Sequence, residues 1–507
     1  MVGRLEFSLG KRPELSRALA EGAGSPNDDS FRIVVMGDFS GRPLEAADQY
    51  HIEAPQRIDI DNFDTVLARL TTGMRLSLPE PADGVFEVSM RSMEDFEPDA
   101  LFLHHPLFAR LRGLRSRLAD PATFEAAAAE LQPGDLPLAA LPPVEDDQTT
   151  LSRLMGTATG GLPPIVGQTS TGLPSSLDRL LRSVLAPYIR PATAHLQQPL
   201  LDAVDRAVGD VMRQLLRHPT WRNVEGSWRC VDNFLRTVDA PGVTLEVLDV
   251  RVAQLALAFD GAKVELMSAE LVRSLGLLSQ GKGLSGRPAV VVGLYEFGSG
   301  HDDLALLSAL AVGCRELGAV LLASAAPGLV LPHLTALSQR LSGLSGLSSP
   351  EPVSAWQALR ALEIARHVAL VYPRVLGRLP YGPKDQPVTS FAFDELGDGP
   401  AHDRLSWRSA ALDAVALLAQ AFDDEGRQFV PDARRSLGEY PAFIDRSQSE
   451  PRLQACAETF WSERELAVMA DLGLIPLISD ARLPRVRLGH WRSVASDGSP
   501  LQGCWCT

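Results

Sequence analysis

The clearest pattern of apolar and polar positions lies in residues 289–326. Residues 289–297 form an apolar run whose first half is β-branched, which predicts a strand buried on both faces. A glycine-containing break at residues 298–300 is followed by two aspartates, and negative charge there favours the start of a helix. A second apolar run at residues 319–323 predicts another strand. Strand, helix and strand at this spacing indicate a βαβ unit and therefore a parallel sheet.

The rest of the chain also contains both apolar patterns typical of strands and apolar patterns typical of helices. Residues 31–36 predict a strand, and residues 74–78 with 85–90 predict a pair of strands. Between residues 200 and 215, Leu and Val recur every three or four positions, as in an amphipathic helix. Residues 463–472 predict a helix that leads into a strand. The sequence therefore predicts a mixed α/β fold with a parallel βαβ core.

A change of composition divides the chain into three parts. Residues 126–176 are rich in Pro, Gly, Ser and Thr, which is typical of a linker. We expect a small N-terminal α/β domain in residues 1–125 and a larger α/β domain in residues 177–507. Inside the linker, residues 150–156 form a short amphipathic island. This island is either a docking segment, a strand lent to a neighbour, or a local patch that packs on its own domain.

Composition narrows the class of protein. The chain has 507 residues, 45% of them hydrophobic, and a formal net charge of −15, which argues against nucleic-acid binding. Its five cysteines are too scattered for a disulfide framework. No signal peptide and no apolar run of about 18 residues is apparent, so we expect a cytoplasmic protein without membrane insertion.

The sequence contains no convincing catalytic, metal or cofactor site. Residues 280–286 are glycine-rich but lack phosphate-loop spacing and precede a strand. Gly298 and Gly300 form half of a dinucleotide fingerprint, but Asp303 stands where its third glycine belongs. His104 and His105 are adjacent, and adjacent residues on a helix do not share a face, so they do not indicate a metal site. Cys504 and Cys506 have no second pair of ligands in the sequence. We therefore expect no enzyme activity and no cofactor.

Two blocks of motifs resemble the two subunits of one assembly. The first block consists of Ile-Val-Val-Met-Gly-Asp-Phe-Ser-Gly (33–41), Arg-Ile-Asp-Ile-Asp-Asn-Phe-Asp (57–64) and Met-Glu-Asp-Phe (93–96). The second consists of Val-Glu-Gly-Ser-Trp-Arg (224–229), Gly-Leu-Tyr-Glu-Phe (293–297), Leu-Pro-Tyr-Gly (379–382) and Ser-Phe-Ala-Phe-Asp-Glu (390–395). The first block resembles the small subunit, and the second the large subunit, of the contractile sheath of type VI secretion systems.

This resemblance implies a structural protein with phage-tail-sheath-like domains. Such a protomer polymerises with itself into a helical tube around an inner tube, on a baseplate, and contracts to propel that tube. It also implies strands exchanged between protomers, and the candidates are Leu5, Phe7 and Leu9 near the start and Val486 and Leu488 near the end. We further expect that a chain truncated after Asp480 still folds but cannot build long polymers.

The resemblance also implies a handle for the AAA+ ATPase that disassembles contracted sheaths. In the family this handle is a short helix at the N-terminus of the large subunit, which here falls in or beside the linker. Two segments are candidates: Leu151, Leu154 and Met155, or Leu177, Leu180 and Leu181.

The fusion of two subunits departs from the usual separate chains and fixes their ratio. The alternatives are a non-polymerising adaptor or minor sheath or baseplate component, and a doubly wound α/β enzyme.

Overall fold

The computed structural model describes residues 30–43, 54–78, 84–131, 181, 183–185, 187–189, 196–259, 288–341, 354–397, 402–446 and 450–505. Its strands are β1 (Phe31–Gly37), β2 (Gln56–Ile58), β3 (Met74–Leu78), β4 (Gly84–Val88), β5 (Val243–Asp249), β6 (Val290–Phe297), β7 (Val320–Ala325), β8 (Val368–Tyr372), β9 (Val375–Leu376), β10 (Trp407–Arg408), β11 (Ser436–Glu439), β12 (Ile444–Asp445), β13 (Arg452–Leu453), β14 (Ile475–Ser479) and β15 (Arg485–Leu488).

Its α-helices are α2 (Phe63–Leu70), α3 (Pro98–His104), α4 (Pro106–Ala119), α5 (Phe124–Leu131), α8 (Gln197–Arg217), α9 (Pro219–Thr237), α10 (Val252–Phe259), α12 (His301–Leu317), α13 (Pro327–Leu341), α14 (Ser354–Arg360), α15 (Ala411–Glu425) and α16 (Glu463–Leu472). Short 3₁₀ turns lie at Met93–Phe96, Glu363–His367, His402–Arg404, Gly426–Gln428 and Pro431–Ala433. Within the described residues, no helix is both long and apolar enough to cross a membrane.

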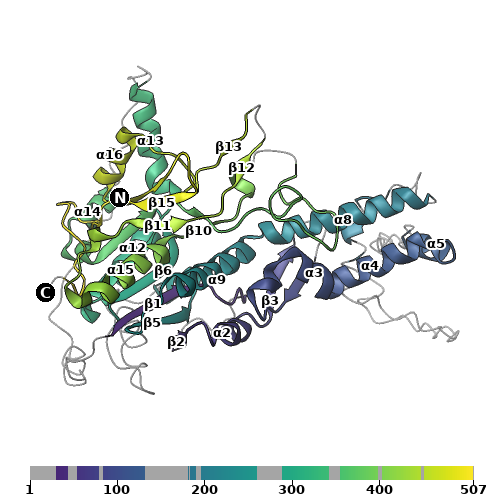
Figure 1. The fold of residues 1–507 in the computed structure, drawn as a ribbon, viewed down its shortest axis with the longest axis horizontal. Coiled ribbons are helices and arrows are strands. Elements are labelled where there is room, and N and C mark those ends of the chain that lie inside the picture. Colours follow the sequence, from purple (N-terminus) through teal and green to yellow (C-terminus); the bar gives the residue numbers. More distant parts are fainter. Residues whose placement is uncertain are drawn as a thin grey trace, which may run out of the picture.

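A nine-stranded sheet forms the centre of the fold, in the order β11-β15-β14-β8-β7-β6-β1-β5-β2 (Figure 1). The six strands from β14 to β5 in this order run parallel to one another. Strand β2 at one end, and β15 and β11 at the other, pair antiparallel. The predicted mixed α/β fold is confirmed, with β6, α12 and β7 as its βαβ core.

Each face of this sheet carries its own hydrophobic core. Along β1, Ile33 and Val35 belong to one core, while Val34 and Met36 belong to the other. The first core also takes in residues of α8, α9 and α15, and the second takes in residues of α12, α14 and α16. All of β1 is buried, as expected for a strand covered on both sides.

The first block of sequence does not stand apart from the second. Strand β1 lies between β5 and β6, with Phe31 opposite Val243 and Ile33 opposite Val290. The two regions therefore share one sheet and both of its hydrophobic cores. The domain boundaries at residues 125, 126–176 and 177 stay a prediction.

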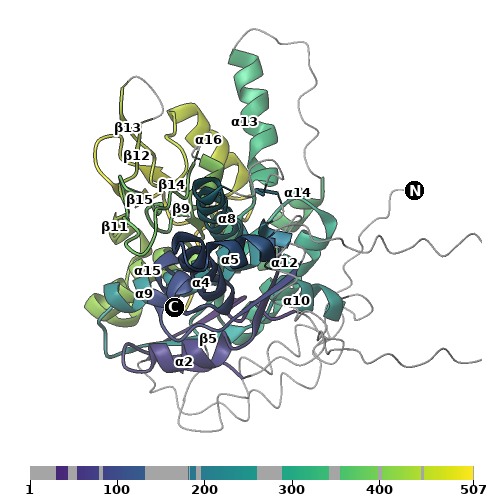
Figure 2. The same cartoon turned by 90° about the vertical axis from the view of Figure 1, so that its right-hand side faces the viewer.

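An elongated arm extends from the sheet. It contains the β3–β4 hairpin with α3, α4 and α5 from the first block, and the start of α8 from the second (Figures 1 and 2). Leu107, Leu111 and Leu118 of α4 are buried. Helix α4 packs along α8, where Arg115 forms a bidentate ion pair with Asp205.

The C-terminal tail is an integral part of the fold. Strand β15 fills the position between β14 and β11, and Trp491, Val494 and Leu501 are buried. The Trp505 ring packs at 5.1 Å from Phe429, which in turn contacts Phe31 of the central strand β1. The structure argues against the expectation that a chain ending at Asp480 still folds, because that cut removes strand β15 and buried residues of both cores.

Candidate functional site at the joint between the two regions

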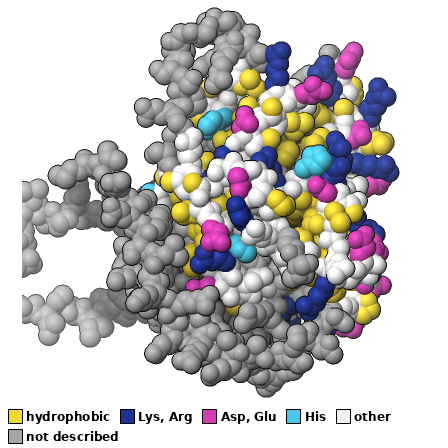
Figure 3. All heavy atoms as spheres, turned by 90° about the vertical axis from the view of Figure 1, so that its left-hand side faces the viewer, with side chains coloured by type: hydrophobic (Ala, Val, Ile, Leu, Met, Phe, Trp, Pro, Cys, Tyr) yellow, Lys and Arg dark blue, Asp and Glu magenta, His cyan; other side chains and the backbone are white. Residues whose placement is uncertain are grey.

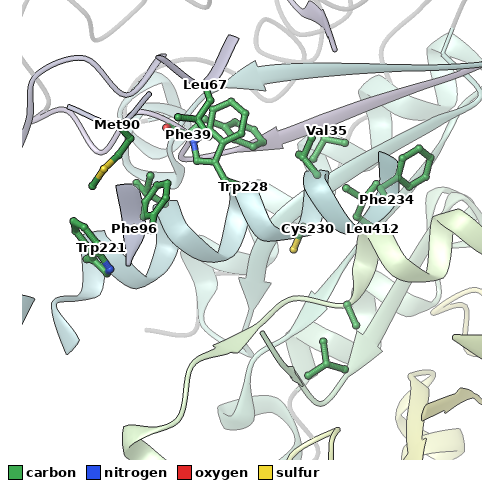
Figure 4. Close-up of a cluster of buried hydrophobic side chains, with 14 of the residues drawn as sticks. Val35, Phe39, Leu67, Met90, Phe96, Trp221, Trp228, Cys230, Phe234 and Leu412 are labelled. Carbon is green, nitrogen blue, oxygen red and sulfur yellow. Dashed lines mark hydrogen bonds between the residues drawn. The ribbon is translucent and has the colours of Figure 1, made fainter. Parts of the chain in front are cut away.

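The motifs that suggested two subunits meet at one joint. Trp228 of α9, from the second block, donates its indole N–H to the Phe39 carbonyl oxygen of the first block at 2.9 Å. Its ring lies edge-on to Phe39 at 5.1 Å and to Phe63 at 5.6 Å. Figure 4 shows this cluster along α9, with Phe39 and Leu67 beside Trp228. A buried indole N–H is favoured by an acceptor, so this bond ties helix α9 to the loop that follows β1.

A second contact joins the arm to the loop of residues 388–395. The Asp99 carboxylate accepts hydrogen bonds from the backbone N–H groups of Thr389 and Ser390 and from the Thr389 hydroxyl. Burial opposes its charge, but these donors hold the pKa of Asp99 below its usual value. Beside it, the Phe102 and Phe391 rings stack at 4.4 Å. The Ser390–Glu395 motif is thus held by the other half of the chain.

Behind the joint lies a buried network of charges. Arg378 donates its Nε–H to Glu225 at 2.7 Å and its two terminal nitrogens to Glu395 at 2.7 and 2.9 Å. Glu225 also accepts from Arg229, one helical turn further along α9. The Arg378 guanidinium lies 4.2 Å from the centre of the Tyr381 ring, and the Tyr381 N–H donates to Glu395. The network therefore joins three motifs of the second block.

The negative charge of Glu225 and the positive charge of Arg378 are each stabilised by neighbouring residues of opposite charge. Burial raises the pKa of Glu225, but the positive charges of Arg378 and Arg229 outweigh it and keep the pKa below its usual value. Burial alone would lower the pKa of Arg378, but Glu225 and Glu395 raise it well above its usual range. Glu225 and Arg378 therefore stabilise each other's charged forms.

At the end of strand β6, the described residues place a carboxylate at the start of helix α12. Asp303, in the first turn of α12, accepts the Gly298 N–H at 2.8 Å, so its carboxylate occupies the position that a phosphate takes at such a helix start. At the neighbouring strand ends, Asp249 accepts from Phe39 and Ser40, and Asp38 accepts from Gly41. Arg42 pairs with Asp249 at 3.7 Å, so the carboxylates at these strand ends are already engaged with groups of the chain itself. Within the described residues, no group of His, Cys, Asp and Glu is placed to hold a metal ion.

Comparison with known protein families identifies both blocks. Residues 198–489 match the VipB family (EvpB/VC_A0108, tail sheath N-terminal domain), and residues 20–129 match the VipA family of the type VI secretion system. The first match alone covers more than half of the chain. The chain belongs to the type VI secretion tail sheath family. It carries the sheath regions of both subunits in one polypeptide, as the sequence motifs predicted.

Two relatives from Pseudomonas aeruginosa agree with this assignment. The chain is 25% identical to the type VI secretion system sheath protein TssC1 over 235 residues, which are 44% of this chain and 46% of that protein. It is 29% identical to the sheath protein TssB1 over 102 residues, 18% of this chain and 57% of that protein. The chain therefore spans about half the length of each of these two relatives. Both are named as sheath proteins and not as enzymes.

The structure places a few of the residues predicted to contact partners. Leu181 is half-buried against the larger core. Val486 and Leu488 are buried, and β15 is paired on both edges within its own chain. In this conformation β15 has no free edge for a neighbour, and exchange there would first require β11 or β14 to leave. The other candidates lie outside the described residues: Leu5, Phe7, Leu9, Leu151, Leu154, Met155, Leu177 and Leu180.

Sequence reasoning missed two residues that anchor the recognised motifs at or beside the joint. Arg378 and Asp99 each lie next to a motif that was recognised, yet neither was given a role. Their partners are far away in sequence: 153 residues separate Arg378 from Glu225, and 290 separate Asp99 from Thr389. A usable signal was the position of Arg378 directly before Leu379–Gly382. It is the one charged residue in residues 375–383, which are otherwise mostly apolar, glycine or proline.

Proposed function

We propose that this chain is the protomer of a contractile sheath, which polymerises in the cytoplasm into a helical tube around the inner tube and contracts to propel it. The observation that supports this most is the joining of a VipA-like and a VipB-like region in one folded unit. Strand β1 of the first region is paired on both edges by strands of the second. One chain thus supplies both sheath parts in a fixed one-to-one ratio.

In this proposal the sheath is a mechanical element and not an enzyme. The energy for contraction is stored in the extended lattice, and each protomer moves as a stiff body. The parallel sheet buried on both faces and the ionised network around Arg378 suit such a body, because both resist deformation. The names of the two relatives, both sheath proteins, support a structural role.

The partners follow from the same proposal. They are further copies of the chain, the inner tube, the baseplate and an AAA+ ATPase that recycles contracted sheaths. The ATPase handle is one of the two leucine-containing segments around residues 151–155 and 177–181. Residues 5–9 are proposed as a strand exchanged between protomers. We also keep the division into residues 1–125, a linker at 126–176, and residues 177–507 as a proposal.

Negative-stain electron microscopy of the full chain expressed alone tests the function. Hollow tubules with a regular helical surface are expected. If discrete particles form instead, the measurement is repeated with the inner tube and baseplate proteins present. Tubules that form under this second condition support a templated sheath, whereas discrete particles under both conditions contradict the sheath proposal.

A non-polymerising adaptor of the sheath or baseplate is the second candidate. The pairing of both edges of β15 favours it, because an adaptor needs no exchanged strand at that end. Size-exclusion chromatography separates the two functions: an adaptor elutes as a monomer or small oligomer at every concentration, whereas a sheath protomer shifts to the void volume as its concentration rises.

A further inference from the structure

Two exposed turns lie at diagonally opposite corners of the central sheet. The first follows β2, the last strand at one end, and carries Ile60 with 69% of its surface exposed. The second joins β14 to β15 near the other end and carries Leu483 with 46% exposed. Because β2 runs antiparallel to β5 while β14 runs parallel to β8, the two turns lie at opposite ends of the strands as well.

The first turn presents its apolar side chain among negative charges. Asp59 and Asn62 bond each other reciprocally, each backbone N–H donating at 3.0 Å to the other's side-chain oxygen. This holds the turn rigid and leaves Ile60 pointing outward beside Asp61 and Asp64, which are both exposed. Residues 59–64 contain three aspartates and no cation. We call residues 59–64 the acidic turn.

The second turn has the opposite charge. The Asp480 carboxylate accepts the N–H groups of Arg482 and Leu483, which fixes its shape. Residues 480–487 contain three arginines, Arg482, Arg485 and Arg487, against this one aspartate, in a chain whose net charge is −15. All three arginines are exposed, and among the described residues only Arg485 has an ion pair, with the exposed Glu439. We call residues 480–487 the basic turn.

We propose that the acidic turn of one copy docks on the basic turn of the next copy, with Ile60 against Leu483 and the aspartates against the arginines. This inference rests on the proposed self-assembly and names the surfaces that perform it. Each turn is a poor partner for itself, because like charges would meet, but a good partner for the other turn. A contact between two different patches is head-to-tail, so it does not close into a dimer. Since the patches lie at diagonal corners, each added copy is also displaced along the strands, as a helical lattice requires.

Figure 3 shows one face of the molecule, on which positive and negative side chains are intermixed. On the face shown there, Lys and Arg side chains lie among Asp, Glu and hydrophobic ones, so this face is mixed in charge. A mixed surface gives little long-range attraction. The short-range match of the two turns therefore selects the partner surface, and assembly through it weakens as salt is raised.

Cysteine cross-linking of the full chain tests the contact directly. The variant Ile60→Cys/Leu483→Cys is oxidised under assembly conditions and run on a non-reducing gel. The expected result is a ladder of many chain lengths, because each copy links to two others. Ile60→Cys mixed with Leu483→Cys should give dimers, and each single variant alone should link no more than the oxidised wild type. The wild type controls for Cys504 and Cys506, and Val85→Cys, which is 59% exposed on β4, controls for chance collisions.

Charge reversal gives an independent measurement. Asp61→Arg/Asp64→Arg should raise the concentration needed for assembly about tenfold. Adding Arg482→Asp/Arg487→Asp to the same chain should restore assembly, since the pairs are exchanged. The matched control is Glu125→Arg/Asp202→Arg on the arm, which makes the same change in net charge and should leave assembly as in the wild type.

The outcomes separate the two proposals. If tubules form but the double cysteine variant gives no ladder and charge reversal has no effect, the contact is overturned while the sheath function stands. If the wild-type chain forms no tubules even with the inner tube and baseplate proteins, the sheath function fails and the contact falls with it. A ladder together with rescue by the exchanged charges supports both.

Discussion

Arg378 is almost completely buried, with 4% of its side chain exposed, and it keeps its charge because Glu225 and Glu395 hold it from two sides. Glu225 has no exposed surface and is shared with Arg229. Removing one member of such a network leaves an uncompensated charge in the interior, which costs far more than the net value of the pair. The packing of the second region beside the joint therefore depends on a few ionised residues.

We predict that Glu225→Gln lowers the free energy of unfolding by about 3–5 kcal/mol, because Arg378 and Arg229 lose their common carboxylate. Urea unfolding of the unassembled protein, followed by circular dichroism, measures this loss. Glu439→Gln is the control, since it breaks the exposed pair with Arg485 and should cost less than about 1 kcal/mol. Similar losses in the two variants would contradict the role given to the network.

The ionised form of Asp38 lowers the stability of the folded protein, and this effect depends on pH. Burial raises its pKa to about 6, and the nearby Asp249 charge adds to this effect. Between about pH 4 and pH 6 the folded protein therefore retains a proton that the unfolded chain has lost. Folding stability falls as the pH rises through this window, by up to about 3 kcal/mol, and stays lower above it.

Asp38→Asn should reduce the dependence of folding stability on pH between about pH 4 and pH 6. The asparagine oxygen can still accept the Gly41 N–H, but the side chain no longer titrates. We expect the variant to be more stable than the wild type at pH 8 and to lose less stability than the wild type between pH 4 and pH 6. Thermal melts across pH, with the exposed Asp239→Asn as a control that follows the wild type, measure this. A variant that is less stable than the wild type at pH 8 would show that the Asp38 charge is needed.

At the scale of elements, the last strand and tail hold the far end of the sheet. Val486, Leu488 and Trp505 are buried, and β15 pairs with β14 and β11. A chain ending at Asp480 should therefore lose cooperative unfolding and be digested by protease within minutes. A chain ending at Trp505 keeps every buried tail residue described here and should behave as the wild type. Cooperative unfolding of the shorter chain would mean that β15 is dispensable.

The sequence predicted those elements whose signal is local. The strands of the βαβ unit and helix α8 follow from the spacing of apolar residues over one segment, and the structure has both. The placement of β1 between β5 and β6 could not be predicted this way, because Phe31 pairs with Val243 more than 200 residues later. The tail was missed for a related reason: residues 489–505 have no periodic pattern and are buried by single contacts such as Trp505 with Phe429.

The whole molecule combines one shared sheet with a segment that carries the proposed ATPase handle. Since Leu181 packs against the main core, a change there affects both folding and recognition. We therefore compare Leu151→Asp/Leu154→Asp with Leu177→Asp/Leu180→Asp. One pair should abolish capture of the sheath by the AAA+ ATPase of the same system in a pull-down while tubules still form. Undiminished capture by both variants would place the handle elsewhere.

The shared sheet also predicts what happens when the linker is cut. A protease site inserted between residues 150 and 160 allows the folded chain to be cleaved into its two regions. The fragments should co-elute, because β1 is hydrogen-bonded to β5 on one edge and β6 on the other and its side chains lie in both cores. Each region expressed alone should aggregate, since the second would lack a central strand and the first would expose β1. If either region folds alone and the cut fragments separate on a column, the regions are independent domains that meet only in the assembled sheath.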